Sequence, residues 1–389
     1  MTLRQRHAAR LAALVLLPLL VCFAQARSPR AAPQEPPAYG TRDDVMRFAD
    51  EVAARQPQLD AAWLRARLER ARYVEAATRL IMPPPAGTAK NWAAYRARFV
   101  ERDRFAAGVA FWIDNAQWLA RAEERWGVPA QIVVGVIGVE TFYGRISGGF
   151  RTLDALATLS FDFPSGRKDR APFFREQLEE FLLWCARERC DPDTVKGSFA
   201  GAIGLPQFMP GSINRYAVDF DADGHIDLAG HPADAIGSVA HYLSAFGWER
   251  GMPTHYGVAV PVDASERAVL LAPDIVPSFS ADEFGARGAV LELLARRHAG
   301  PLALVELQNG TAAPSYVAGT KNFYVVTRYN WSSYYAMAVI ELGAAVARQM
   351  PPLLPALSFE PLSVPQPALE APPLELAPCC SDYAPPSTP

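Results

Sequence analysis

The strongest constraint on the fold of this chain is an apolar segment, residues 131–139, that offers no polar face. Gly127 stops the preceding helical pattern, and Pro129 suits the first turn of a new helix. The residues that follow are mostly branched and aliphatic, namely Ile132, Val133, Val134, Val136, Ile137 and Val139. A helix without a polar stripe must be covered on all sides. The segment therefore predicts a fully buried helix.

Glu140 is the first acidic residue of this predicted helix and lies near its end. Gly144 follows and suits the C-cap. A carboxyl beside apolar walls and near the negative end of a helix has a raised pKa. A carboxyl with a raised pKa is still protonated near neutral pH, as a general acid must be. The segment alone also fits a structural role, in which Glu140 pairs with Arg145 or reaches solvent.

The start of the chain has the features of an export signal. A basic start (Arg4, Arg6, Arg10) precedes an apolar run from Leu11 to Phe23, and Ala24-Gln25-Ala26 supplies the small residues that signal peptidase prefers. The run is shorter than the roughly 20 residues of a membrane-spanning helix. We therefore expect cleavage near Ala26 and a periplasmic protein. A lipid anchor on Cys22 is the less favoured alternative, because bulky Val21 precedes that cysteine.

The remaining chain divides by composition and periodicity into five parts. We expect a flexible lead (27–40), a helical catalytic region (41–250), a small strand-bearing insertion (251–325), a return to the helical body (326–350) and a Pro-rich disordered tail (351–389). Proline occupies twelve of the last thirty-nine positions, and each removes a backbone donor. The sequence therefore predicts a mainly α fold of the α+β type.

Within these parts, individual elements are predicted from local patterns. Helices are expected over 43–80, as two helices over 91–124, after Pro210 over 212–217, and over 235–246 with Asp234 as the cap. Strands are expected over 258–262, 302–307 and 323–327, with a turn at Asn309-Gly310 and a helical patch over 281–297.

Charge and cysteine content narrow the function classes. The net charge of −3 and the interspersed acidic and basic residues do not indicate a nucleic-acid-binding surface. No Cys/His spacing resembles a zinc site. Cys185 and Cys190 are five residues apart across a predicted helix end, so a local disulfide and two separate thiols both stay open. No organic cofactor is indicated.

A second segment with chemical content is the glycine-rich stretch 196–210. Its three glycines, interleaved with small residues, allow the backbone to approach a ligand closely. Gln207 can both donate and accept hydrogen bonds, as recognition of a sugar acetamido group requires. Alone, the stretch also fits a tight loop between helices, but Glu140 upstream makes a glycan site the more specific interpretation.

Together, these motifs closely resemble the lytic murein transglycosylase B family (glycoside hydrolase family 103). The resemblance is carried, in order, by Gly-Val-Glu-Thr around Glu140, 154–160 (DALATLS), 197–202 (GSFAGA), 207–210 (QFMP), 234–240 (DAIGSVA) and 327–330 (TRYN), and it covers roughly 40–350. It implies a lysozyme-like helical core with accompanying helices and a small β-containing domain. Leu205-Pro206 and Gly211 depart from the commonest family sequence around Gln207.

The resemblance also implies roles for individual residues. Glu140 matches the family's catalytic acid/base. Residues expected to contact glycan are Ser198, Gln207, Tyr95, Tyr242, Tyr329, Asn330 and Tyr335. Tyrosine rings can stack on sugar faces while their hydroxyls form hydrogen bonds. The structural alternative for each tyrosine is a half-buried core aromatic.

Most glycosidases use two carboxyl groups, but only Glu140 lies in a motif that looks catalytic. We interpret Asp154 as fixing the loop after the Glu140 helix. Glu140 would protonate the oxygen of the MurNAc–GlcNAc β-1,4 bond and then deprotonate the MurNAc C6 hydroxyl, which closes a 1,6-anhydro ring. A goose-type muramidase that hydrolyses the same bond and a non-catalytic peptidoglycan-binding protein are the alternatives.

A third segment, 219–227, has the pattern D-x-D-x-D-G-x-I-D of a calcium-binding EF-hand loop. Asp219, Asp221 and Asp223 would supply side-chain oxygens, His225 its backbone carbonyl, and Asp227 a further carboxylate. Gly230 stands where an EF-hand has a bidentate Glu, and the family resemblance implies a later Asp, Asp234, as the closing ligand of an EF-hand-like loop 219–234. The rings of His225 and His231 are not expected to bind the ion. We expect a structural Ca²⁺; the alternative is an acidic, solvated turn.

Overall fold

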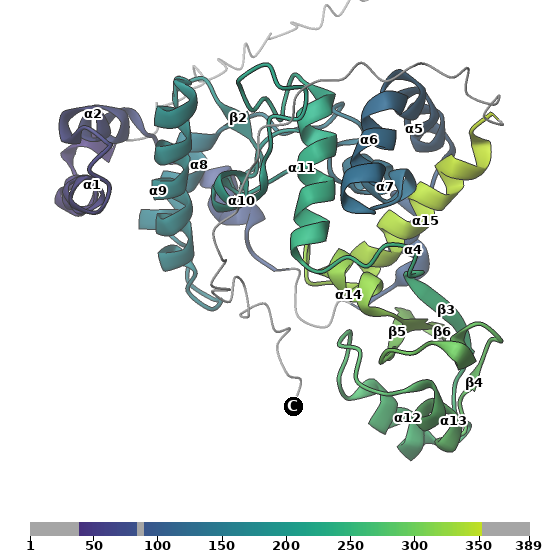
Figure 1. Ribbon diagram of the computed structural model, residues 1–389. Coiled ribbons are helices and arrows are strands. Elements are labelled where there is room, and N and C mark those ends of the chain that lie inside the picture. The colour runs from purple at the N-terminus through teal and green to yellow at the C-terminus, as the bar shows by residue number, and fades with distance from the viewer. Residues whose placement is uncertain (1–38, 84–88, 352–389) are drawn as a thin grey trace, which may run out of the picture. The chain divides into compact units, whose positions relative to one another are not determined.

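The computed structural model describes residues 39–83 and 89–351 (Figure 1). The predicted signal peptide, the cysteine of the alternative lipid anchor, almost all of the expected lead and the Pro-rich tail after residue 351 lie outside this range. Tyr39, however, is buried, and its hydroxyl donates to an Asp162 carboxylate oxygen at 2.7 Å, so the folded chain includes the end of the expected lead. None of the helices in the described ranges has the length and apolar character needed to span a bilayer.

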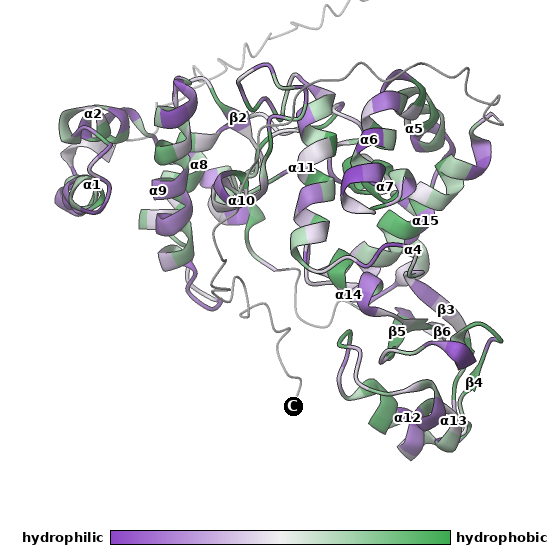
Figure 2. Cartoon of the chain, in the orientation of Figure 1, coloured by the Kyte–Doolittle hydropathy of each residue, from purple (hydrophilic) through white to green (hydrophobic). Residues whose placement is uncertain are grey.

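The predicted buried helix is α7 (Ala130–Thr141), and all but two of its residues are buried. Gly127, with φ of 72°, ends α6 just before it, as expected. Its main partner is α15 (Ser333–Gln349), which crosses α7 in Figure 1 and is largely hydrophobic in Figure 2. Gly135 lies against the Val339 carbonyl, and Gly343 lies against the Gln131 carbonyl, where a Cβ atom would clash. These two glycines let the helix backbones touch.

The other helices of this body cover most of the described chain. They are α1 (Asp43–Arg55), α2 (Ala61–Arg70), α3 (Glu75–Leu80), α4 (Trp92–Ala97), α5 (Arg102–Asp114), α6 (Ala116–Trp126), α8 (Thr152–Phe161), α9 (Ala171–Glu188), α10 (Pro210–Tyr216) and α11 (Pro232–Ala245), after a short 3-10 turn η1 (Tyr39–Thr41). Residues 43–80 are helical as predicted. The prediction of two helices over 91–124 was wrong: there are three, because the Glu101 carboxylate caps α5 and Asn115 separates α5 from α6.

A four-stranded antiparallel sheet forms the strand-bearing part. Its order is β4-β3-β6-β5, with β3 (His255–Ala259), β4 (Val290–Leu291), β5 (Ala303–Asn309) and β6 (Ala312–Gly319), and a separate two-stranded ladder joins β1 (Phe150–Arg151) to β2 (Lys196–Gly197). Helices α12 (Ala264–Leu271) and α13 (Ala281–Ala286) accompany the sheet. A second hydrophobic cluster, including Leu270, Phe284 and Leu304, fills this part. The division of the chain at residues 250 and 325 stays a prediction.

Two of the three predicted strands are present. The strand expected over 258–262 lies at 255–259, and the one expected over 302–307 is β5; Asn309-Gly310 leads into β6 as the predicted turn. The helical patch expected over 281–297 ends at residue 286; β4 and the short 3-10 helix η2 (Ala295–Arg297) follow.

The strand predicted over 323–327 was wrong, because this segment is helix α14 (Lys321–Thr327). The Thr320 hydroxyl caps it by accepting from the Asn322 amide. The Asn322 side chain in turn donates to the carbonyls of Glu249 and Met252, which fixes the first turn. A short apolar run with several β-branched residues does not by itself distinguish a buried strand from a buried helix.

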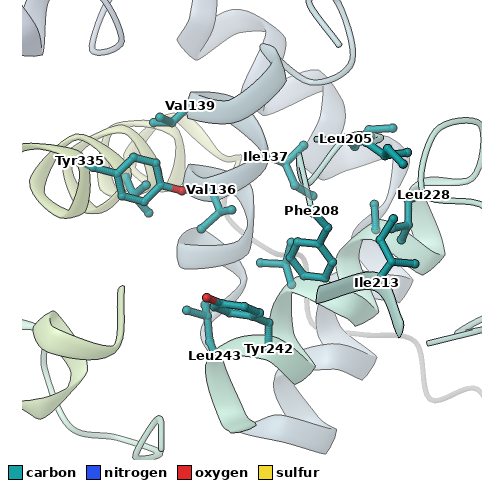
Figure 3. Close-up of a cluster of buried hydrophobic side chains, with 14 of the residues drawn as sticks. Val136, Ile137, Val139, Leu205, Phe208, Ile213, Leu228, Tyr242, Leu243 and Tyr335 are labelled. Carbon is teal, nitrogen blue, oxygen red and sulfur yellow. The ribbon is translucent and has the colours of Figure 1, made fainter. Parts of the chain in front are cut away.

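The core around α7 also reaches the glycine-rich stretch. Figure 3 shows Val136, Ile137 and Val139 of α7 together with side chains from 205–208, α10, α11 and α15. Tyr335 points its hydroxyl toward α7 in the same view. The buried helix thus brings Glu140, the stretch 196–210 and the start of α15 to one place.

Candidate active site

Glu140 lies in the last turn of α7, where the chain is held firmly on both sides. The hydroxyl of Thr141 donates to the Leu205 carbonyl at 3.0 Å, which ties this turn to the glycine-rich stretch. Phe142 follows with a φ of 52°, in the left-handed region, and ends the helix. Gly144 is therefore not the C-cap that the sequence predicted. Strained backbone of this kind is common where a side chain must be aimed at a site.

The Glu140 carboxyl is partly buried and has one protein partner. The Tyr335 hydroxyl donates to Oε1 at 2.6 Å. Burial raises the pKa of Glu140 from 4.5 to about 7, and the hydrogen bond from Tyr335 acts in the opposite direction. Desolvation therefore outweighs the hydrogen bond. A carboxyl with this pKa can give up and take back a proton near neutral pH.

Three of the predicted tyrosines pack together beside Glu140. Tyr329 stacks on Tyr335 with centroids 6.0 Å apart and an interplanar angle of 15°, and its centroid lies 5.0 Å from that of Tyr242. Tyr335 and Tyr242 are only 2% and 8% exposed, so their ring faces are not open platforms for a sugar. Their hydroxyls are used inside the protein: Tyr242 donates to the Arg328 carbonyl at 2.8 Å. The family resemblance implies that these residues belong to the site, and the burial of Tyr242 and Tyr335 agrees with the core-aromatic alternative that the sequence left open.

Tyr95 and Asn330 are the more accessible members of the predicted set. Tyr95, on α4, is half-buried; burial, followed by the negative charge of Glu140, raises the pKa of Tyr95 to about 12. Asn330 is exposed and has no hydrogen-bond partner among the residues that the structure describes. Tyr329 is intermediate in exposure, and its hydroxyl donates to the Pro206 carbonyl at 2.6 Å.

The glycine-rich stretch presents Ser198 and Gln207 in well-fixed orientations. Ser198 Oγ accepts from the amides of Ala200 and Ala202, so its own hydroxyl proton stays available for donation. Gln207 Nε2 donates to the carbonyls of Ser147 and Gly204 at 3.1 and 2.9 Å. Two carbonyl partners fix the orientation of the amide and leave Oε1 as the free acceptor within the described chain.

The backbone conformation of Gln207 is unusual and supports this orientation. Its φ of 50° lies in the left-handed region, between Gly204 (φ 73°) and the core residue Phe208. Ile203 and Phe208 pair through their backbones across this turn. The fold thus holds a non-glycine residue in a disfavoured conformation, which aims the amide.

Asp154 does not lie with Glu140 in a catalytic pair. Its carboxylate accepts from the Arg72 amide at 2.8 Å and is bound by the Arg151 guanidinium at 2.5 and 2.8 Å. It therefore holds Arg151, at the end of the loop after the Glu140 helix, in agreement with the prediction, and it also fixes the segment after α2.

Arg104 is a residue near the site that sequence reasoning missed. It is 9% exposed, and its Nη1 donates to the Gly138 carbonyl at 2.5 Å, near the end of α7. Its guanidinium lies 4.2 Å from the centroid of Phe142. Arg104 is one of two arginines on α5, and nothing in its local sequence distinguishes it from the exposed Arg102.

The acidic loop brings three carboxylates together. One oxygen from each of Asp219, Asp221 and Asp234 lies within 4.8 Å of the others, and Asp221 and Asp223 form a second group with His231. Gly224 has a φ of 93°, as the turn position of the EF-hand pattern requires. A set made of carboxylate oxygens suits a hard cation such as Ca²⁺. The residues present therefore fit calcium.

Asp234 differs from its predicted place as a helix cap. Helix α11 begins at Pro232 with His231 as N-cap, and Asp234 lies inside the first turn. Its carboxylate oxygens accept from the amides of Phe220 and Asp227 at 2.7 and 2.8 Å. Burial, and more weakly the charges of Asp221 and Asp219, raise the pKa of Asp234. Asp227 instead turns back to accept from the amides of Ala229 and Gly230.

The two internal cysteines are free thiols in the structure. Cys185 is buried, and the Cys190 amide donates to the Cys185 carbonyl at 3.0 Å across the left-handed end of α9. The two cysteines are therefore unbridged in the structure, and their thiols hydrogen-bond to each other.

A mainly helical fold with one part-buried carboxyl of raised pKa, beside a fixed amide and tyrosines, defines a carbohydrate-cleaving enzyme of the lysozyme-like class. Residues 40–344 match the family described as "Transglycosylase SLT domain", and the chain belongs to this family. It is a lytic murein transglycosylase B-like enzyme that cleaves peptidoglycan. The resemblance stated from the sequence is thereby confirmed.

Three known proteins illustrate the similarity. The chain is 40% identical over 317 residues to membrane-bound lytic murein transglycosylase B of Escherichia coli (strain K12), covering 79% of this chain and 84% of that protein. It matches the structure of the E. coli lytic transglycosylase Slt35 in complex with calcium with a TM-score of 0.69 and 38% identity, covering 82% of this chain and 99% of that one. Against Pseudomonas aeruginosa SltB3 in complex with NAG-anhNAM-pentapeptide, the TM-score is 0.65 at 27% identity, with coverage of 77% and 78%.

Proposed function

We propose that this enzyme cleaves the β-1,4 bond between MurNAc and GlcNAc by an intramolecular reaction, with Glu140 as both acid and base and 1,6-anhydroMurNAc as the new end. The observation that carries the proposal is the Glu140 carboxyl itself. Burial raises its pKa to about 7, and Asp154, the other carboxylate considered, is already bound by the Arg151 guanidinium and the Arg72 amide. A pKa near the working pH suits a group that must act first as an acid and then as a base.

In the first step, protonated Glu140 gives its proton to the bridging oxygen as the bond from MurNAc C1 to that oxygen breaks. The electron pair leaves with GlcNAc, and the N-acetyl group of MurNAc can stabilise the cationic centre. In the second step, ionised Glu140 removes the proton of the MurNAc C6 hydroxyl, whose oxygen bonds to C1. Glu140 is protonated again, and no water is consumed.

The neighbouring groups supply binding and orientation. Tyr335 holds Oε1 of Glu140 through its 2.6 Å hydrogen bond. Gln207 offers a free Oε1 acceptor for an acetamido N–H, and Ser198 offers a hydroxyl donor. We assign Tyr95, Tyr329 and Asn330 to direct contact with glycan because they are the more exposed members of the set, and Tyr242 to support of Tyr329.

We further propose that the acidic loop binds one structural Ca²⁺. The side chains of Asp219, Asp221 and Asp234 would hold it, with Asp223, Asp227 and the His225 carbonyl as the remaining ligands of the loop. The related Slt35 has been crystallised with calcium. A divalent cation would offset the repulsion among these carboxylates and brace the loop that packs through Leu228 on the glycine-rich stretch, where the Leu205 amide donates to the Leu228 carbonyl.

We place the enzyme in the cell envelope, where its polymeric substrate lies and where the E. coli relative is membrane-bound. The predicted signal peptide supports export to the periplasm, with the Cys22 lipid anchor as the less favoured alternative.

The test is digestion of purified sacculi followed by mass spectrometry of the released fragments. Anhydro-muropeptides support the proposed reaction, reducing-end products would assign the hydrolase reaction, and no release would assign a binding protein. Glu140→Gln keeps the shape and the acceptor for Tyr335 but removes the proton transfer, so we expect a loss of about 10²–10⁴-fold or more. Glu51→Gln, an exposed change on α1, is the matched control and should leave the rate unchanged. Full activity of Glu140→Gln would refute the assignment.

A further inference from the structure

Beside the end of α7, three arginines alternate with two phenylalanines. The guanidinium carbons of Arg104 and Arg145 lie 4.2 and 4.9 Å from the centroid of Phe142. Those of Arg98 and Arg104 both lie 5.5 Å from the centroid of Phe99. We call this series, Arg98–Phe99–Arg104–Phe142–Arg145, the arginine ladder. Each ring face holds a guanidinium in place, so less side-chain entropy is lost when a ligand binds.

The two outer guanidiniums of the ladder have no carboxylate partner in the described chain. Arg98 and Arg145 are exposed and form no ion pair with a described residue. Arg104 has only Glu101, at 3.8 Å. Arg42, which also lies over aromatic rings, is by contrast neutralised by Asp44 and Asp162. Arg121 and Arg125 lie over rings without an ion pair to a described residue, so the distinguishing feature of the ladder is that three guanidiniums gather on two neighbouring rings. Like charges gathered without counter-charges favour binding of an anion.

The ladder lies next to the proposed reaction centre. Phe142 follows Glu140 by two residues, and the guanidinium carbon of Arg98 is 5.8 Å from the centroid of Tyr95. Burial is the main cause of the raised pKa of Tyr95. The negative charge of Glu140 raises this pKa further and the positive charge of Arg98 lowers it, in agreement with this placement. An anion bound to Arg98 or Arg145 would thus be separated from the cleaved bond by only one or two side chains.

We propose that Arg98 and Arg145 bind carboxylates of the peptide stem of peptidoglycan and make the enzyme prefer peptide-substituted strands. The inference rests on the function proposed above. The stem is attached through the lactyl group of MurNAc, the sugar on which Glu140 acts, so it must leave the glycan close to this carboxyl. Its residues carry free carboxylates, which a guanidinium can bind through two parallel hydrogen bonds.

The experiment compares two substrates: sacculus-derived glycan strands with intact peptide stems, and the same strands after an amidase has removed the peptides. The variants are Arg98→Gln, Arg145→Gln and the double substitution. Arg102→Gln is the matched control, because Arg102 is exposed, lies between Arg98 and Arg104 in sequence and is not part of the ladder. All are purified as the full exported chain, and kcat/KM is measured on both substrates.

We expect the ratio of kcat/KM on peptide-bearing strands to that on peptide-free strands to fall about 10-fold in each single variant, mainly through KM. Arg102→Gln should keep the wild-type ratio. Equal losses on the two substrates, or an unchanged ratio, would overturn the inference while leaving the proposed reaction intact. An inactive wild-type enzyme on both substrates would instead contradict the proposed function.

Discussion

Replacing Glu140 by Gln should stabilise the folded protein at pH 8 even as it abolishes activity. The physical reason is that the last turn of α7 holds the carboxyl in a poorly solvated place, with Tyr335 as its one protein partner. Burial raises the pKa of Glu140 from 4.5 to about 7, so the folded state disfavours the ionised form. Gln has nearly the same shape, accepts the same hydrogen bond from Tyr335 and never ionises.

The size and pH window of the effect follow from proton linkage. Below pH 4.5 the carboxyl is neutral in the unfolded and the folded chain, so the raised pKa of Glu140 imposes no penalty. Between about 4.5 and 7 the unfolded chain ionises while the folded chain keeps its proton, and stability falls as pH rises. Above about pH 7 the penalty is complete. It amounts to roughly 3 kcal/mol, because a difference of one between the folded and unfolded pKa corresponds to about 1.4 kcal/mol.

The assay is urea unfolding of wild type and Glu140→Gln at several pH values from 4 to 8.5, followed by circular dichroism. We expect the free energies of unfolding to be similar at pH 4 and the variant to be more stable by about 3 kcal/mol at pH 8, with similar m-values. Glu51→Gln should show no pH-dependent difference. A difference that is constant across this range would refute the reasoning that burial, rather than side-chain volume, sets the protonation of Glu140.

Three further predictions concern its surroundings. Tyr335→Phe removes a bond to a charged group, worth about 1.5 kcal/mol; it should raise the pKa of Glu140 further and move the basic limb of the pH–rate profile up by about one pH unit. Gly135→Ala should cost at least 2 kcal/mol in urea unfolding, because its Cβ meets the Val339 carbonyl, whereas a Cβ at Gly149 meets nothing within 4 Å and is the control. Added Ca²⁺ at 100 times its Kd should stabilise wild type by about 2.7 kcal/mol, visible as a higher Tm, and Asp221→Asn should abolish that response.

The parts of this fold that could be predicted are those in which a local pattern has one physical solution. A run of branched apolar residues with a single acid at its end must form a buried element, and the run bounded by Gly127 and Glu140 is long enough to be a helix. Asn309-Gly310 between two alternating segments has few alternatives to a hairpin turn. The aspartate spacing of 219–223 likewise brings oxygens of Asp219 and Asp221 together, whereas Asp227 turns away to the amides of Ala229 and Gly230.

The parts that could not be predicted depend on distant partners. Residues 323–327 are helical because the Asn322 side chain bonds carbonyls about seventy residues away. Asp234 looks like a cap by local sequence, yet its carboxylate is used by amides of the acidic loop. The hydrogen bond from Tyr335 to Glu140 spans 195 positions in the chain. The family resemblance placed both residues in the site, but their contact is a property of the α7–α15 packing.

That contact also bears on how one carboxyl could perform both proposed steps. Because the Tyr335 hydroxyl donates to Oε1, that oxygen is the acceptor in the neutral and the ionised acid alike. Oε2, which no described residue bonds, is left to carry the proton. In the proposed reaction the same oxygen would release the proton to the bridging oxygen and then receive the proton of the C6 hydroxyl. The carboxyl would not need to rotate between the steps, so Tyr335 would shorten the path between acid and base, in addition to partly offsetting the rise that burial causes in the pKa of Glu140.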